Sequence, residues 1–210
     1  MQNNCVELHA LANRLPIHSF PYDEHEIPLN GIYLFFEKGE YAHGTNRIVR
    51  VGTHTGETQL RTRLKEHFLA KNKDRSIFRK NIGRCLLNKV QDPFIKQWEI
   101  DLTSRIARDQ YSASIDFDKQ SVVEQAVSQY IQTNFSFVTL PVNDKSARLT
   151  FESKIISTIS LCPLCEPSTQ WLGSFSPKKQ IRESGLWQVQ ELYKEPLSND
   201  DLDRLNDFLV

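Results

Sequence analysis

The spacing of hydrophobic residues in the first third of the chain predicts two strands followed by a helix. Residues 31–36 and 47–52 are rich in β-branched and aromatic side chains, whereas residues 38–46 between them are mainly turn formers. Apolar side chains then recur at every fourth position over residues 60–68, after Thr58, which is a plausible N-cap. The pattern thus changes from that of a hairpin to that of a helix.

The rest of the chain carries mostly helical spacing. Residues 135–142 are an exception, because their aromatic and β-branched content predicts a third strand that ends near Pro141. Residues 98–111 fit neither period and are interpreted as an insertion. Helices are predicted over residues 5–14, 77–87, 122–131, 144–159 and 199–209.

The distribution of charge indicates a polyanion as partner. The 210-residue chain has 26 basic and 26 acidic residues, and therefore no net charge. Between Arg47 and Lys89, however, twelve lysines and arginines stand against three acidic residues. A basic segment in a neutral protein suits a nucleic acid. The alternative is an ordinary solvated face.

The cysteines and the start of the chain favour a reducing compartment. Four cysteines form no obvious disulfide framework, and the first residues lack the basic and apolar regions of a secretory signal. No stretch approaches the roughly 18 continuous apolar residues of a membrane span. We therefore expect a cytoplasmic protein without a membrane partner.

Two features of the C-terminal region are expected to be structural. Cys162-Pro163-Leu164-Cys165 has no second cysteine or histidine pair at zinc-finger spacing, so a turn is favoured over a zinc site. Trp171, Trp187 and Tyr193 could stack on bases, but bulky aromatic residues in a C-terminal segment more often close a core.

Three short motifs resemble the GIY-YIG nuclease superfamily. They are Gly31-Ile32-Tyr33, Arg50-Val51-Gly52 and Leu60…Arg63-Leu64…His67. Members usually carry Gly-Ile/Val-Tyr, then Tyr-Ile/Val-Gly, then an arginine and often a histidine one helical turn apart. Arg50 stands where the second motif normally has its tyrosine, so no role of that tyrosine is carried over. The stretches Trp171-Leu172-Gly173 and Ser184-Gly185-Leu186-Trp187 also resemble a subgroup of about this length.

The elements and the resemblance together imply an α/β (α+β) fold. We expect a small, largely antiparallel three-stranded sheet flanked by helices, with an N-terminal arm. Residues 1–210 are predicted to form a single domain, with a GIY-YIG-like nuclease core over 29–160 and a C-terminal extension over 161–210.

The resemblance implies catalytic roles for several side chains. Arg63 would bind the scissile phosphate through its planar guanidinium, and Tyr33 would activate or position the attacking water. His67 would orient Tyr33 or the phosphate, or shuttle a proton. The alternatives are a packed ring for Tyr33 and surface positions for Arg63 and His67. His54, just after the second motif, or Arg50 is expected to replace the missing tyrosine.

Glu152 is the acidic residue that the sequence favours as a metal ligand. It lies within or beside the apolar stripe of its predicted helix, where an unpaired carboxylate is costly. The resemblance implies a single metal-ligating glutamate on a helix after the third strand, which is where Glu152 falls. Such a carboxylate, completed by water, suits Mg²⁺ or Mn²⁺. Glu124 is the rival ligand, and an ion pair with Arg148 is the alternative state of Glu152.

We therefore hypothesise a metal-dependent endonuclease that hydrolyses phosphodiester bonds in DNA. The alternatives are a catalytically inactive nucleic-acid-binding protein of the same fold and a structural or partner-binding protein. The predicted catalytic residues are Tyr33, Arg63, His67, His54 and Glu152. The predicted DNA contacts are Arg50, Arg61, Lys71, Lys73, Arg75, Arg79 and Lys80.

Overall fold

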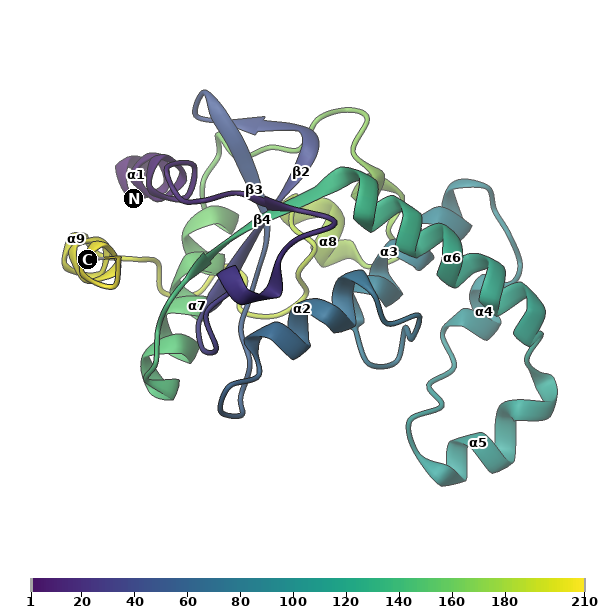
Figure 1. The fold of residues 1–210 in the computed structure, drawn as a ribbon. Helices are drawn as coiled ribbons and strands as arrows, with labels where there is room; N and C mark the ends of the chain where they lie inside the picture. Colours follow the sequence, from purple (N-terminus) through teal and green to yellow (C-terminus); the bar gives the residue numbers. More distant parts are fainter. Residues whose placement is uncertain (1, 210) are drawn as a thin grey trace.

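The computed structural model, which describes residues 2–209, contains a four-stranded antiparallel sheet between two layers of helices (Figure 1). The strands are β1 (His18–Ser19), β2 (Ile32–Ala42), β3 (Thr45–Gly52) and β4 (Phe135–Leu140), in the order β1-β4-β2-β3. The mixed α/β class and the antiparallel sheet are confirmed. The prediction of three strands is wrong by one, because β1 is only two residues long and too short to show a period.

The β2–β3 hairpin is longer than its sequence suggests. β2 continues to Ala42 and β3 already starts at Thr45, so most of the predicted loop over 38–46 is strand. The chain reverses at His43 and Gly44, which both have positive φ angles. The polar residues here lie on a hairpin arm whose pairing is irregular between Phe36 and Tyr41, which explains the weak strand signal.

Nine helices surround the sheet in the described part of the chain. They are α1 (Gln2–Ala12), α2 (Leu60–Phe68), α3 (Ile77–Lys89), α4 (Ile95–Trp98), α5 (Arg105–Tyr111), α6 (Phe117–Asn134), α7 (Lys145–Ser160), α8 (Lys179–Ser184) and α9 (Asn199–Asp207). The six helices predicted from periodicity are all present, as α1, α2, α3, α6, α7 and α9. Thr58 is not the N-cap of α2, since Gln59 holds that position and the Thr58 amide donates to the Asn30 side chain.

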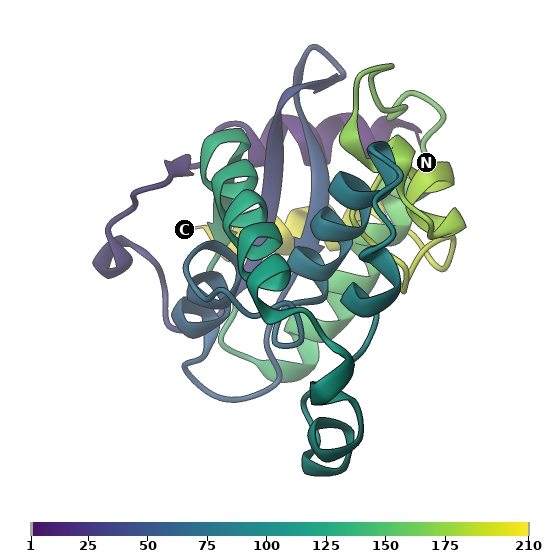
Figure 2. The ribbon, with the colours of Figure 1, turned by 90° about the vertical axis from the view of Figure 1, so that its right-hand side faces the viewer.

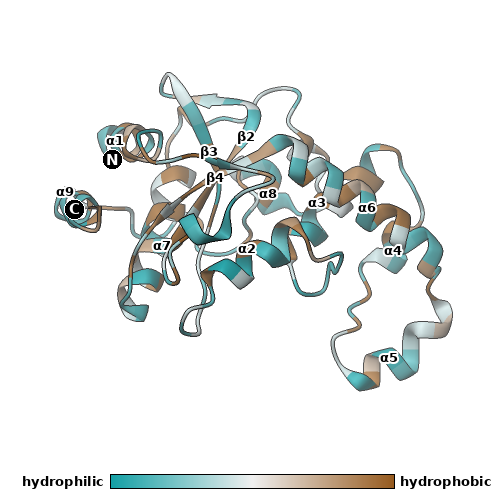
Figure 3. Ribbon diagram, viewed as in Figure 1, coloured by the Kyte–Doolittle hydropathy of each residue, from teal (hydrophilic) through white to brown (hydrophobic). Residues whose placement is uncertain are grey.

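The central strand β2 divides the apolar residues between two cores. Successive side chains of a strand point to opposite faces. Ile32 and Leu34 accordingly join a core with α1, α7 and α9, whereas Tyr33 and Phe35 join one with α2, α3 and α6. Figure 2 shows α3 and α6 in front of the strands and α1 behind them. Hydrophobic residues gather between these layers, while α5 projects from the body of the protein (Figure 3).

A buried carboxylate joins the sheet to the C-terminal region. The Trp171 and Trp187 indole N–H groups each donate to Glu37 Oε2 at 2.8 Å, and the Tyr130 hydroxyl donates to Oε1 at 2.5 Å. Both tryptophans are buried, which confirms their predicted place in a core, whereas the same prediction is wrong for Tyr193, which is 50% exposed. Burial raises the pKa of Glu37 although the three donors oppose the shift. The pair of indoles thus docks onto β2 through one side chain.

Two substitutions of Glu37 distinguish the contribution of its hydrogen bonds to stability from that of its charge. Glu37→Ala should lower the free energy of unfolding by roughly 3 kcal/mol, because each buried donor left unsatisfied costs about 1–3 kcal/mol. Glu37→Gln should lose much less, since its oxygen can accept from both indoles and its amide can donate to Tyr130. Urea unfolding of both variants checks this expectation. Equal losses in the two variants would contradict it.

Candidate active site

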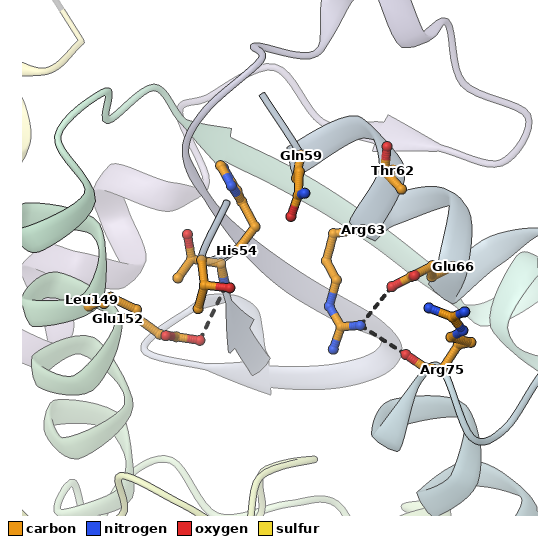
Figure 4. Close-up of a pocket in the computed structure, with 10 residues that line it drawn as sticks. His54, Gln59, Thr62, Arg63, Glu66, Arg75, Leu149 and Glu152 are labelled. Carbon is orange, nitrogen blue, oxygen red and sulfur yellow. Dashed lines mark hydrogen bonds and ion pairs between the residues drawn. The ribbon is translucent and has the colours of Figure 1, made fainter. Parts of the chain in front are cut away.

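A pocket of about 510 Å³ opens where β3 ends, between α2 and α7 (Figure 4). Arg63 comes from α2, Glu152 from α7, and His54 from the segment that follows β3. The structure therefore brings together three of the five residues predicted as catalytic. The lining residues are Thr53, His54, Thr55, Gln59, Thr62, Arg63, Glu66, Arg75, Leu149 and Glu152.

Glu152 points into this pocket with most of its hydrogen-bonding capacity unused. Its Oε1 accepts the Thr53 amide at 3.2 Å. Burial raises its pKa, while the positive charge of Arg50 and the Thr53 amide lower it in part. The predicted alternative of an ion pair with Arg148 is wrong, because that guanidinium donates to the Val142 and Asn143 carbonyls. Among the described residues, Glu152 has no lysine or arginine within ion-pair distance.

The rival glutamate, Glu124, has a structural environment instead. Its carboxylate is buried and accepts from the Arg79 guanidinium at 2.7 Å and from the Lys73 amide at 2.5 Å. It does not line the pocket. Glu124 therefore lies on a helix, as the prediction of a metal ligand required, but its charge is already neutralised by Arg79.

Arg63 lies across the pocket from Glu152. Its Nη1 donates to Glu66 Oε2 at 2.8 Å and to the Arg75 carbonyl at 3.0 Å. Burial lowers the pKa of Arg63, but the neighbouring Tyr33 oxygen and the Glu66 carboxylate outweigh burial and the net pKa is raised. With its side chain 27% exposed, this guanidinium is a fixed positive charge that a ligand can reach.

Behind Arg63, Tyr33 and His67 form a buried hydrogen-bonded chain with Ser76. The Tyr33 hydroxyl lies 2.8 Å from His67 Nε2, and His67 Nδ1 lies 2.7 Å from the Ser76 hydroxyl. Burial, followed by the charge of Arg63, lowers the pKa of His67 well below its usual value, so the ring is neutral. The predicted alternative of a solvent-exposed position for His67 is therefore wrong, because the side chain is fully buried.

The neutral ring of His67 has a single N–H and therefore two possible arrangements. Ser76 Oγ already accepts the Arg79 amide as the N-cap of α3. In one arrangement, His67 Nε2–H donates to the Tyr33 oxygen and Nδ1 accepts the Ser76 hydroxyl. In the other, Nδ1–H donates to Ser76 Oγ and Nε2 accepts the Tyr33 hydroxyl. In both arrangements Nε2 holds the Tyr33 hydroxyl group in place.

Only one of the two candidates to replace the missing tyrosine faces the pocket. His54 lines it, with Nδ1 donating to the Gly56 carbonyl at 2.7 Å and Nε2 accepting the Gly31 amide at 3.3 Å. Burial lowers the pKa of His54. Arg50 is buried and does not line the pocket. Its Nη1 donates to the Trp187 carbonyl at 2.6 Å and to Gln188 Oε1 at 2.9 Å.

A second pocket, of about 770 Å³, continues from the first and shares Arg63, Glu66 and Arg75 with it. Lys71 and Arg108 add further positive charge to its lining, Arg108 from the insertion that contains α5. Lys71 and Arg75 are exposed. The two pockets form one groove with cationic walls.

The other predicted DNA contacts are engaged with the protein itself. Arg79 pairs with Glu124, Lys73 and Lys80 both contact Asp74, and all of them are buried. Arg61 is half-buried and donates to the Ile27 carbonyl at 2.8 Å. Much of the basic segment seen in the sequence therefore stabilises the fold, and only part of it is available to a ligand.

Several residues in or behind the groove were missed by the sequence reasoning. Glu66 follows Arg63 by three positions, a spacing that would have suggested their ion pair. Ser76 precedes the apolar start of α3 and could have been recognised as its N-cap. Arg108 carries no local signal, because only the tertiary fold brings the insertion to the groove.

Comparison with known proteins identifies one family. The protein-family model described as GIY-YIG domain matches residues 11–210. Neither the curated proteins nor the solved structures include a significant match. Within residues 2–209, no helix combines the length and the apolar character needed to cross a membrane.

The neutral state of His67 predicts a pH dependence of stability. An unfolded histidine takes up a proton below about pH 6.5, whereas folded His67 stays neutral until a much lower pH. The unfolded state then binds the extra proton, so the free energy of unfolding should fall by about 1.4 kcal/mol per pH unit below that value. Urea unfolding of the parent and of His67→Gln at several pH values isolates this contribution. The same slope in both proteins would mean that His67 titrates normally.

Proposed function

The chain belongs to the GIY-YIG domain family, whose members are generally metal-dependent nucleases, and on this basis we propose that it is an endonuclease that hydrolyses phosphodiester bonds in DNA. The observation that carries the proposal is the convergence of Arg63, His54 and Glu152 on one pocket, with Tyr33 and His67 hydrogen-bonded behind it. These residues come from four separate segments of the chain. A purely structural role would not require them to meet beside solvent.

Glu152 is the residue that would hold the divalent cation, Mg²⁺ or Mn²⁺. The fit rests on a carboxylate that accepts one amide hydrogen, lacks an ion-pair partner among the described residues and faces an open pocket. Mg²⁺ keeps several of its waters and needs few protein ligands, so a single carboxylate suits it. When bound, the cation supplies positive charge beside the phosphate oxygens.

Arg63 would neutralise the scissile phosphate. Guanidinium has five N–H donors in a plane that matches phosphate oxygens. The described contacts of Arg63 with Glu66 and the Arg75 carbonyl use Nη1, which fixes the group at the pocket wall. A rigid donor aimed at developing negative charge stabilises a transition state without reorganisation.

Tyr33 would position the attacking water, or take up its proton as it attacks phosphorus while its own hydroxyl hydrogen passes to His67 Nε2. His67 would act on Tyr33 by holding its hydroxyl group through Nε2, and is therefore a positioning residue. His54 presents its ring to the same pocket, near the place of the altered second motif. The phosphorus–oxygen bond to the leaving strand then breaks, and the released oxygen takes up a proton.

A second function is favoured by one observation, the burial of Arg50. The position that usually carries the tyrosine of the second motif holds an arginine, which has no hydroxyl. Its guanidinium donates to Trp187 and Gln188 and does not line the pocket. The alternative is therefore a protein that binds nucleic acid in the same groove without cutting it. Binding that needs no divalent cation, with no cleavage of any substrate, would support this alternative.

Cleavage should depend on Arg63 and Glu152. We expect Arg63→Ala and Glu152→Gln each to lower the rate of DNA cleavage by about 100-fold or more, the effect of removing one group that stabilises the transition state. The assay follows nicking of supercoiled plasmid and cutting of branched duplexes with Mg²⁺ or Mn²⁺, and includes RNA for comparison. Lys65→Ala on the same helix as Arg63, and Glu183→Gln on α8, are matched controls that should retain activity. A Glu152→Gln variant that cuts as fast as the parent would disprove the metal assignment.

Binding should depend on the exposed cations of the groove. Lys71→Ala combined with Arg75→Ala should reduce the slope of log affinity against log salt by about two, because each phosphate contact contributes about one. Fluorescence anisotropy with labelled duplex, over a range of salt concentrations, measures the slope. Lys179→Ala, exposed on α8 and outside both pockets, should leave it unchanged. A slope equal to that of the parent in the double variant would place the DNA elsewhere.

A further inference from the structure

A second cluster of reactive side chains lies away from the groove. Cys5, His9, His43 and Cys165 bring one ligand atom each to within 4.8 Å of one another. Cys5, His9 and Cys165 are buried, and His43 is half-buried. Neither pocket of the groove includes any of them.

The fold assembles this cluster from three segments. Cys5 and His9 are four residues apart on α1 and therefore share one face of that helix. His43 sits at the tip of the β2–β3 hairpin, where a φ angle of 53° turns its side chain out of the strand register. Cys165 closes the turn that begins at Cys162, because its backbone amide donates a hydrogen bond to the Cys162 carbonyl at 3.2 Å.

The spacing of the ligand atoms is that of a tetrahedral metal site. With zinc–sulfur and zinc–nitrogen bonds of about 2.3 and 2.05 Å, tetrahedral edges are about 3.8 Å for two sulfurs and 3.6 Å for sulfur and nitrogen. Cys5 Sγ and Cys165 Sγ lie 3.4 Å apart, and Cys165 Sγ lies 3.3 Å from His43 Nε2 and 4.0 Å from His9 Nε2. Small adjustments would therefore centre a cation among them.

The hydrogen bonds of His9 prepare its Nε2 as an acceptor. Its Nδ1 lies 2.9 Å from the Cys5 carbonyl, to which it donates, so the lone pair is on Nε2. A backbone carbonyl commonly fixes a metal-binding histidine in this way. Nε2 accepts the Ile48 amide at 3.2 Å, and a cation would take the place of this donor.

We propose that Cys5, His9, His43 and Cys165 bind one Zn²⁺ in a closed structural site. Two thiolates and two imidazoles are a donor set typical of zinc, and four protein ligands leave no open position for substrate. The sequence favoured a plain turn at Cys162–Cys165, because its partners are distant in the chain. Only the fold brings α1 and the hairpin tip to that turn.

The zinc would tie together the N-terminal helix, the hairpin and the C-terminal extension. Cys5 and His9 precede the region that the family model matches, so this attachment lies partly outside the matched domain. The site is also remote from the catalytic groove. β2 separates Tyr33 from the hairpin tip by a length of roughly 30 Å, at about 3.3 Å per residue.

Metal analysis of the full chain tests the proposal. Protein made without a polyhistidine tag, in zinc-supplemented medium and purified without chelator, should contain about one zinc per chain. Cys5→Ser and Cys165→Ser should each retain less than about a fifth of that amount, because each loses one of two thiolates. Cys85→Ser, which removes another buried cysteine, is the matched control and should keep the zinc. Cys162→Ser should also keep it, although this thiol lies 3.6 Å from His43 Nε2.

Cobalt substitution provides a readout that needs no variant. The parent loaded with Co²⁺ should show the strong visible absorption of tetrahedral cobalt and a thiolate charge-transfer band. A folded parent without zinc or cobalt, a disulfide between Cys5 and Cys165, or full zinc content in both cysteine variants would overturn the proposal. Nuclease activity is not measured, so the result is independent of the proposed function.

Discussion

The close approach of Tyr33 to Gly52 is the constraint on which the pocket end of the sheet depends. The two residues are cross-strand partners, and a Cβ atom on Gly52 would lie 2.1 Å from the Tyr33 hydroxyl oxygen. The phenol can therefore cross the end of β3 only because residue 52 has no side chain. From there it reaches His67, which places α2 and with it Arg63. The tyrosine of the first motif and the glycine of the second motif thus pack directly against each other.

Around this constraint, the protein uses buried polar groups in two different ways. Glu37, Glu124 and Arg79 have partners for their charge or their hydrogen bonds inside the fold, and they hold elements together. Glu152 and Arg63 instead keep donors or acceptors directed at a pocket. Residue type does not separate the two groups, because each contains a glutamate and an arginine that lie on helices. The distinction is whether a second chain segment covers the charge.

This difference explains what the sequence could and could not predict. The six longer helices and the principal strands follow from apolar spacing, which reflects burial directly, whereas the short helices α4, α5 and α8 were not predicted. The pocket residues Arg63 and Glu152 stood in recognisable positions. The sequence could not show that Arg50, Lys73 and Arg79, which were predicted as DNA contacts, bind partners inside the fold. Their guanidinium or ammonium groups turn inward to partners more than 25 residues away, such as Trp187, Ile100 and Glu124. The short β1 strand and the Cys/His cluster likewise exist only through contacts that are distant in the chain.

The arginine of the altered second motif gives the C-terminal extension an unexpected importance. Arg50 lies on β3 near the pocket end of the sheet, and the carbonyl and amide oxygens that accept from it belong to Trp187 and Gln188. A chain truncated at residue 160 would leave this guanidinium without those acceptors and Glu37 without two of its three donors. The segment that resembles a minimal nuclease is therefore not a self-sufficient unit here, and attempts to shorten the protein to that length would remove part of its interior.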